Sequence, residues 1–197
     1  MQTFQKNALL LIAACALSTG ASAHTGHGTE SFMEGLVHPF GLDHLLAMVA
    51  VGIWSVAALP ARQAWQGPAT FLLTLVLSAV LGASGVTLPY LEHAIALSVV
   101  LFGAMLVMAA KPLPTSVGLG LIAAAASLHG LAHGAETPAT GFAGYAVGFL
   151  LTTAALHLGG VGAGLAVRRW LAARSTVVLG GLGTALGVAG VYLFSQV

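Results

Sequence analysis

Two short stretches carry side chains that can hold a metal ion, and each adjoins a long apolar run. The first reads H-P-F-G-L-D-H over residues 38–44 and contains His38, Asp43 and His44. Its proline suits the first turn of a helix, so we expect His38 just before that helix. A straight helix would not place all three side chains on one side. We therefore expect either that His38 reaches in from the helix edge or that Gly41 permits a local break.

The second stretch reads L-H-G-L-A-H-G-A-E over residues 128–136. On a helix, His129 and His133 are four residues apart and Glu136 is three further on, so the three side chains share one face. Imidazole and carboxylate groups are ligands for divalent transition metals, which makes this face a candidate metal site. The alternative for both stretches is a polar helix end that faces lipid headgroups.

The composition indicates that lipid surrounds most of the chain. Of 197 residues, 58% are hydrophobic and only 6% are charged, and the mean hydropathy is +0.97. Soluble domains are about 25% charged. Only helices and closed barrels span lipid, and the apolar runs lack the two-residue alternation of a barrel strand. The net charge of +1 suggests no nucleic-acid partner. Ionisable groups are costly in lipid, so the two stretches are unusual there.

The first 23 residues resemble a secretory signal. A lysine near the start precedes an apolar segment over residues 8–17, and A-S-A at 21–23 fits a cleavage site. An uncleaved first helix and a lipoprotein cleavage site at Cys15 are the alternatives. Cleavage after residue 23 would leave a short periplasmic segment over residues 24–35 and a mature chain without cysteine.

The rest of the chain, 36–197, predicts an all-α membrane protein, a six-transmembrane-helix bundle behind a cleavable signal peptide. A span needs about 20 apolar residues. The expected spans are about 36–58, 69–88, 91–110, 114–135, 141–167 and 175–195.

Charge is distributed unequally between the two ends of these spans. All mature basic residues fall in alternate links, namely Arg62, Lys111, Arg168, Arg169 and Arg174. The positive-inside rule makes these links cytoplasmic, so both mature termini should be periplasmic in the bacterial inner membrane. Four glutamates lie at or beyond the other ends: Glu30, Glu34, Glu92 and Glu136. This outward face would attract cations.

Several other residues are secondary candidates. Glu92 opens the third span at the outer side, where it and His93 are either metal-binding or simply interfacial. His157, in the fifth span, is either an inner station on a path or a buried histidine bonded to a nearby carbonyl. His24 and His27 would begin the mature chain and could bind metal there, although a flexible terminus is the alternative.

Both stretches are similar to motifs of the HupE/UreJ family of small nickel permeases. H-P-F-G-L-D-H-L-L-A-M-V-A-V-G at 38–52 resembles the first motif, with four residues between His38 and Asp43 where the family pattern has five. H-G-L-A-H-G-A-E at 129–136 resembles the second, with Leu128 where a phenylalanine is common. The resemblance covers essentially the whole chain. It implies that metal recognition is carried by His38, Asp43, His44, Glu92, His133 and Glu136. Family members lie beside hydrogenase or urease genes, or import cobalt.

We therefore expect a secondary permease for Ni²⁺, with Co²⁺ as the second candidate, that uses no prosthetic group. The chain has no G-x-x-x-x-G-K-[ST] loop and no soluble domain, so we do not expect it to hydrolyse ATP or to be an enzyme. The expected partners are the metal ion as substrate and the lipid bilayer.

Three alternatives belong to other classes of protein. Residues 82–85 read G-A-S-G and match an intramembrane serine protease motif, although Ser84 would lie near the outer edge of its span. A membrane metal-dependent hydrolase could use the same histidines. A haem-binding bundle could take axial ligands from four histidines, His44, His129, His133 and His157.

Overall fold

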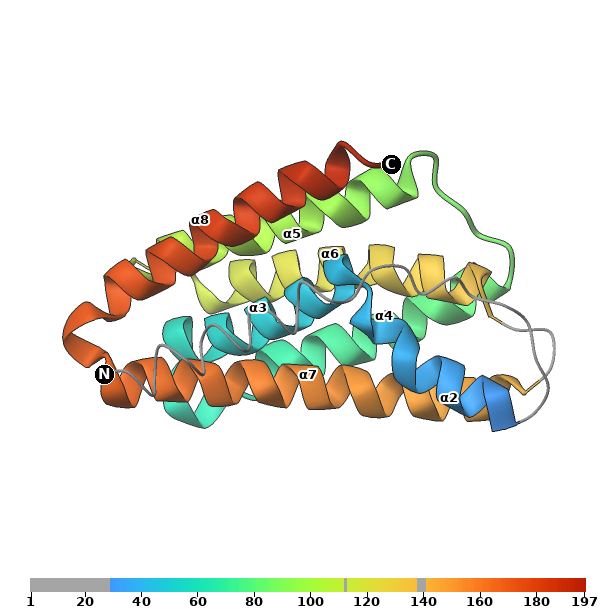
Figure 1. Cartoon of the computed structure of the whole chain (residues 1–197), viewed down its shortest axis with the longest axis horizontal. Helices are drawn as coiled ribbons and strands as arrows, with labels where there is room; N and C mark the ends of the chain where they lie inside the picture. The colour runs from blue at the N-terminus through green and yellow to red at the C-terminus, as the bar shows by residue number, and fades with distance from the viewer. Residues whose placement is uncertain (1–28, 112, 138–140) are drawn as a thin grey trace.

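The computed structural model describes residues 29–111, 113–137 and 141–197, and its regular elements in these ranges are all helical (Figure 1). The longer helices are α2 (Thr29–Val37), α3 (Leu42–Ala58), α4 (Gln66–Ala83), α5 (Leu91–Val107), α6 (Thr115–Ala135), α7 (Phe142–Trp170) and α8 (Ser175–Phe194). Short 3-10 helices are η1 (His38–Phe40), η2 (Ala61–Gln63), η3 (Met108–Ala110) and η4 (Ala172–Arg174). The predicted signal peptide, Cys15, His24 and His27 lie outside the described residues.

The described residues contain five helices long and apolar enough to cross a membrane, and a sixth if α2 and α3 form one bent span. The expected all-α membrane fold is therefore confirmed. The first span, expected over about 36–58, is broken at Gly41, where α2 and α3 meet at 69°. Residues 29–35, expected to be part of a short terminal segment, belong to α2.

Proline and glycine set most helix ends close to the expected bounds. Leu59 is extended after α3, the conformation favoured before Pro60. Pro114 begins α6 from an extended conformation. The second span, α4, ends at Ala83 and not at residue 88, as was expected. Two residues later Gly85 has a φ of 93°, a conformation that does not continue an α-helix.

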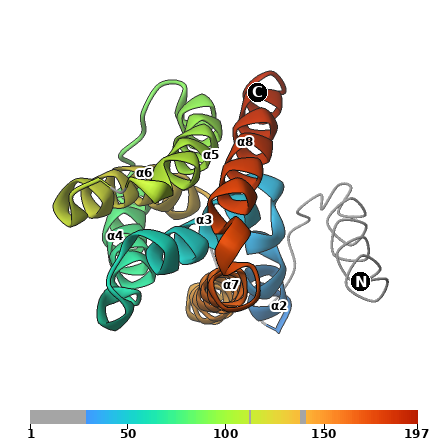
Figure 2. The same cartoon turned by 90° about the vertical axis from the view of Figure 1, so that its left-hand side faces the viewer.

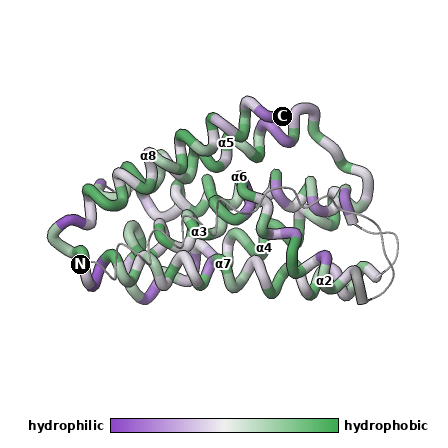
Figure 3. Tube along the Cα trace, in the orientation of Figure 1, coloured by the Kyte–Doolittle hydropathy of each residue, from purple (hydrophilic) through white to green (hydrophobic). Residues whose placement is uncertain are grey.

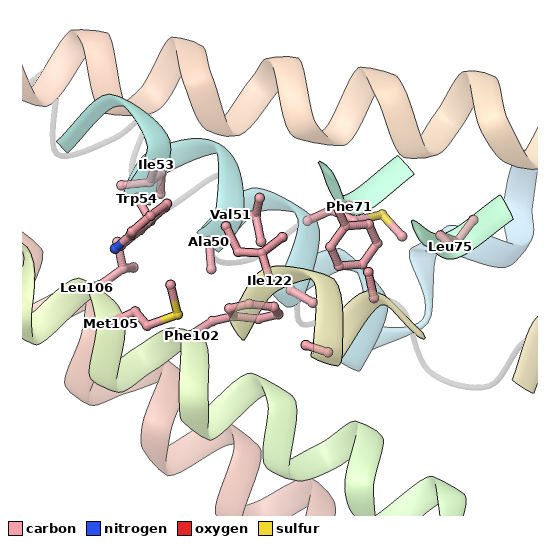
Figure 4. Packing of buried hydrophobic residues seen from close by; sticks show 14 of the residues in the cluster. Ala50, Val51, Ile53, Trp54, Phe71, Leu75, Phe102, Met105, Leu106 and Ile122 are labelled. Carbon is pink, nitrogen blue, oxygen red and sulfur yellow. The ribbon is translucent and has the colours of Figure 1, made fainter. Parts of the chain in front are cut away.

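Helix α3 lies at the centre of the bundle and contacts α4, α5 and α7 (Figure 2). Around it, α4 packs on α6, α5 on α8, and α2 on α7. Met48, Val51, Phe71, Phe102 and Ile122 form part of the buried core between these helices (Figure 4). A central helix of this kind can hold polar side chains away from lipid.

The links separate into a basic end and an acidic end of the bundle. The basic end holds the α3–α4, α5–α6 and α7–α8 links, which carry Arg62, Lys111 and Arg174. The acidic end holds the α4–α5 and α6–α7 links, beside Glu92 and Glu136 (Figure 1). Between the ends the helices are predominantly apolar (Figure 3).

Candidate metal site

A break between α2 and α3 turns His38 towards the interior. Its residues are His38–Phe40, a 3-10 turn that contains Pro39, and Gly41, whose ψ of 136° interrupts the helical path. Of the two arrangements expected from the sequence, a local break at Gly41 is the one that the structure contains. The rings of His38 and His44 consequently lie 6.3 Å apart between centroids, on either side of the bend.

Helix α6 supplies the opposite wall, and glycines bring it close to α4. A Cβ at Gly130 would collide with the carbonyl oxygen of Leu75, and one at Gly134 with that of Ala79. Small residues permit such close approach between membrane helices. His129 and His133, which are fully or almost fully buried, stand on this same helix.

The two sequence motifs meet through direct contacts between imidazole rings. The His44 ring lies 4.3 Å from that of His133 and 4.6 Å from that of His129, between centroids. His38 lies 4.7 Å from His133 by the same measure. Potential ligand atoms of His38, His133 and Glu136 all lie within 4.8 Å of one another. The structure thus brings together both histidines of each motif, although the motifs are about 90 residues apart.

Asp43 determines which nitrogen of His44 is available to a ligand. His44 Nδ1 lies 2.8 Å from Asp43 Oδ1. A carboxylate accepts hydrogen bonds, so Nδ1 carries the proton and donates it. The other nitrogen, Nε2, is buried and has no hydrogen-bond partner among the described residues. His44 therefore presents a bare lone pair, the usual arrangement of a metal-binding histidine supported by a carboxylate.

Ser98 of α5 determines in the same way which nitrogen of His129 is available to a ligand. The Ser98 hydroxyl donates to the Ile95 carbonyl oxygen at 2.7 Å, and its oxygen also lies 3.0 Å from His129 Nε2. A hydroxyl has one proton, so His129 must be the donor in the second contact. This leaves His129 Nδ1 with a lone pair and, within the described chain, no partner.

His133 contacts the rings of His38 and His44, and it is the histidine of the cluster whose two nitrogens both lack a hydrogen bond in the described structure. Neither of its nitrogens has a hydrogen-bond partner in the described part of the chain, and its exposed fraction is 3%. Buried polar groups without partners are uncommon and costly. A cation held by the His38, His133 and Glu136 group would satisfy one of the His133 nitrogens, which a purely structural packing of histidines would not do.

Two glutamates stand at the acidic-end rim of the cluster. Glu136 caps the end of α6, with Oε2 3.6 Å from His38 Nε2. Partial burial raises the pKa of its carboxyl, and the charge of Glu92 acts in the same direction. Glu92 is exposed at the start of α5 and does not belong to the group of closely spaced ligand atoms. It lies at the same end of the bundle as Glu136, and its charge acts on that carboxyl.

The two remaining histidines of the described chain have different surroundings. His157 is fully buried in α7, and its Nδ1 lies 2.8 Å from the Thr153 carbonyl oxygen, as one sequence interpretation expected. His93 lies at the acidic end against two aromatic rings, with centroid separations of 5.8 Å to Tyr90 and 5.0 Å to Phe194.

Three residues near the site were not predicted. Besides Ser98, Tyr145 lies 5.8 Å from His38 and Phe149 lies 4.4 Å from His133, between ring centroids. The spacing of four between Tyr145 and Phe149 marks one helical face, which is a weak signal in an apolar helix. Nothing in the sequence linked Ser98 to a histidine 31 residues away.

The geometry argues against two of the alternatives. The exposed Ser84 hydroxyl donates to the Leu81 carbonyl oxygen at 2.7 Å, on its own helix, and no contact with a histidine is seen among the described residues. The clustered imidazoles touch one another at centroid separations of 4.3–4.7 Å, which leaves no room for a porphyrin ring between them.

Fold and site together define a multi-pass membrane protein with a buried cluster of imidazoles and carboxylates. A model of the family described as HupE / UreJ protein matches residues 12–193. The chain is 42% identical over 153 residues to Protein HupE of Rhizobium leguminosarum bv. viciae, an alignment that covers 77% of this chain and 79% of that protein. No solved structure matches the chain. The chain belongs to the HupE/UreJ family, whose members are metal permeases associated with nickel uptake for hydrogenase or urease.

Proposed function

We propose that this protein is a secondary permease that carries Ni²⁺, or alternatively Co²⁺, across the bacterial inner membrane. The observation that carries the proposal is the contact of His44 with His129 and His133 inside an apolar bundle, next to the closely spaced ligand atoms of His38, His133 and Glu136. Imidazole and carboxylate ligands favour divalent transition metals over Mg²⁺. The metal would supply a metalloenzyme such as hydrogenase or urease.

The distribution of charge supports one orientation. With the basic end in the cytoplasm, both mature termini are periplasmic, and we propose that residues 1–23 are removed as a signal peptide. The acidic end then faces the periplasm, where metal enters. Inward movement of a divalent ion gains about 4.6 kcal/mol per 100 mV of membrane potential, twice the value for one charge. This gradient would drive uptake without ATP.

The arrangement of ligands supports an order of events. Glu92 and Glu136 attract the hydrated ion at the rim, and His38 contacts it next. His44, His129 and His133 then replace water in its coordination shell, while Asp43 orients His44 and offsets positive charge. Neutral imidazoles bind less tightly than a thiolate cage, which suits a site that must also release its ion.

Nickel uptake in a nickel-starved bacterial host without its own importers tests this function. Radioactive Ni²⁺ accumulation would be compared between the intact chain, Asp43→Ala and His133→Ala, with cobalt, zinc and copper as competitors. His93→Ala is the matched control, because this histidine lies outside the cluster. We expect both site variants to abolish uptake and the control to retain it. Absence of uptake by an intact chain that reaches the membrane would refute the proposal.

A further inference from the structure

Beyond the site already described, a second pair of unpartnered polar atoms lies deeper in the bundle. His157 and Thr153 are one turn apart on α7, and both have an exposed fraction of 0%. The rings of Phe149 on α7 and His133 on α6 lie 4.4 Å apart between centroids, so these two residues are nearly level. His157 follows Phe149 by eight residues, about 12 Å along α7, whereas His129 precedes His133 by four residues, about 6 Å along α6, at 1.5 Å per residue. His157 is therefore farther from the acidic end.

A hydrogen bond determines the chemical form of His157. Its Nδ1 lies 2.8 Å from the Thr153 carbonyl oxygen, which can only accept, so Nδ1 carries the proton. Nε2 is left with a lone pair and has no hydrogen-bond partner in the described part of the chain. In metal-binding histidines the N–H of the other ring nitrogen commonly donates a hydrogen bond to a backbone carbonyl oxygen in this way.

The Thr153 side chain adds a second unpartnered polar atom, an oxygen, to the same helical turn. Its Oγ1 is buried and likewise without a hydrogen-bond partner among the described residues. The neighbouring Thr152 shows the contrast, because its hydroxyl donates to the Leu36 carbonyl oxygen at 2.9 Å. Two orphaned polar atoms on one buried turn are costly, and an apolar pair would pack there without that cost.

The ring of Phe71 contacts a histidine of each position. Its centroid lies 5.6 Å from that of His129 and 4.9 Å from that of His157. Phe71 is fully buried and stands in the core near Val51 and Ile122 (Figure 4). No direct ring contact between His129 and His157 is seen in the described structure, and Phe71 is the ring that contacts both of them.

We propose that His157 Nε2 and Thr153 Oγ1 form an inner binding position for the transported divalent ion, one step beyond the His44–His129–His133 cluster. The inference rests on the proposed function and deepens it. Ion pathways require binding that is weak or shared among several sites, since a single tight site would not release its ion. Two occupied positions repel each other, which promotes release from the inner one towards the basic end.

Binding of Co²⁺ to the purified chain in detergent tests the inner position directly. Cobalt serves as the probe because its visible absorbance reports ligation and bound ions can be counted. We expect two equivalents for the intact chain and one each for His157→Asn, Thr153→Val and His133→Ala. Asparagine retains a donor near the position of Nδ1 and removes Nε2, and valine retains the shape of threonine. His93→Asn and Thr184→Val are matched controls, since the Thr184 hydroxyl is satisfied within α8.

Uptake of Ni²⁺ by the same variants separates the two proposals. We expect His157→Asn and Thr153→Val to lower uptake about tenfold or more, as loss of metal-site support commonly does, while both controls keep full uptake. Two equivalents of cobalt with full uptake in these variants would overturn the inner position and leave the permease proposal intact. An intact chain that binds a single equivalent of cobalt and still transports nickel would also overturn the inner position and leave the permease proposal intact. An intact chain that neither binds nor transports would overturn both.

Discussion

At the scale of single residues, hydrogen bonds to neighbouring groups set which nitrogen of His44 and of His129 can bind a metal. Asp43 and Ser98 each accept a hydrogen bond from one imidazole nitrogen and leave the other nitrogen free. Such supporting groups orient a metal ligand and maintain its tautomer. Ser98 is the more informative case, because its hydroxyl proton is already committed to the Ile95 carbonyl oxygen.

Replacing Ser98 by alanine should therefore weaken metal handling without removing a ligand. We expect Ser98→Ala to reduce nickel affinity or uptake about tenfold, at the lower end of effects seen for supporting groups. The apparent KM of uptake measures this. Ser127→Ala is the control, because the Ser127 hydroxyl donates to the Ala124 carbonyl oxygen of its own helix. Equal KM values for the two variants would show that Ser98 has no influence on His129.

External pH should control uptake through competition between protons and metal. Metal ligands must be deprotonated, so uptake should fall as the external medium is acidified and protons compete with metal for the imidazole nitrogens. The raised pKa of Glu136 means that this carboxyl loses its charge at a higher pH than an ordinary glutamate as the medium is acidified. Glu136→Gln should thus show lower uptake and a shallower decline in acid. Uptake measured across pH at constant membrane potential would test this, and a flat profile for the intact chain would contradict histidine ligation.

At the scale of elements, the site depends on two helix contacts, the bend between α2 and α3 and the close pairing of α4 with α6. The bend moves His38 off the α3 axis and towards His133. The pairing relies on Gly82, Gly130 and Gly134, where a Cβ would strike backbone atoms of the facing helix. The position of the α6 histidines relative to α3 follows from this pairing.

Two glycine substitutions in α6 should have opposite effects. Alanine in place of glycine normally stabilises a helix interior by about 1 kcal/mol. At Gly120, where nothing lies within 4 Å of an added Cβ, we expect Gly120→Ala to retain or raise thermal stability and to preserve uptake. At Gly134 the added Cβ would collide with the Ala79 carbonyl oxygen, so Gly134→Ala should lower both. Thermal unfolding in detergent and nickel uptake measure the pair, and identical behaviour would refute the packing argument.

At the scale of the whole molecule, charge separation and the position of the cluster support one direction of transport. The basic residues lie at one end, whereas the histidine cluster contacts Glu136 at the other. This polarity places the metal-capturing rim on the periplasmic side of the proposed topology.

Single cysteines should report that topology. In a background with Cys15 replaced, Ser84→Cys at the acidic end should react with a membrane-impermeant thiol reagent in cells with a permeabilised outer membrane. Arg62→Cys at the basic end should react only after the inner membrane is broken. Both positions are exposed. The reverse labelling pattern would show that the protein has the opposite orientation in the membrane. Nickel uptake by Ser84→Cys should be unchanged, which also tests the protease alternative.

The sequence by itself determined the properties that arise from local composition. Long apolar runs required lipid-embedded helices, prolines marked several helix ends, and the spacing of His129, His133 and Glu136 placed them on one face. Both candidate metal-binding motifs were evident for the same reason, because residue type and spacing are sequence properties.

Only the tertiary structure decided which groups meet. The 69° bend at Gly41, the contact of His44 with His133 and the pairing of Ser98 with His129 join residues separated along the chain. Helical periodicity predicts a face but not the neighbour that this face packs against. That choice follows from side-chain volume and glycine contacts summed over the bundle, and a short window of sequence does not contain that information.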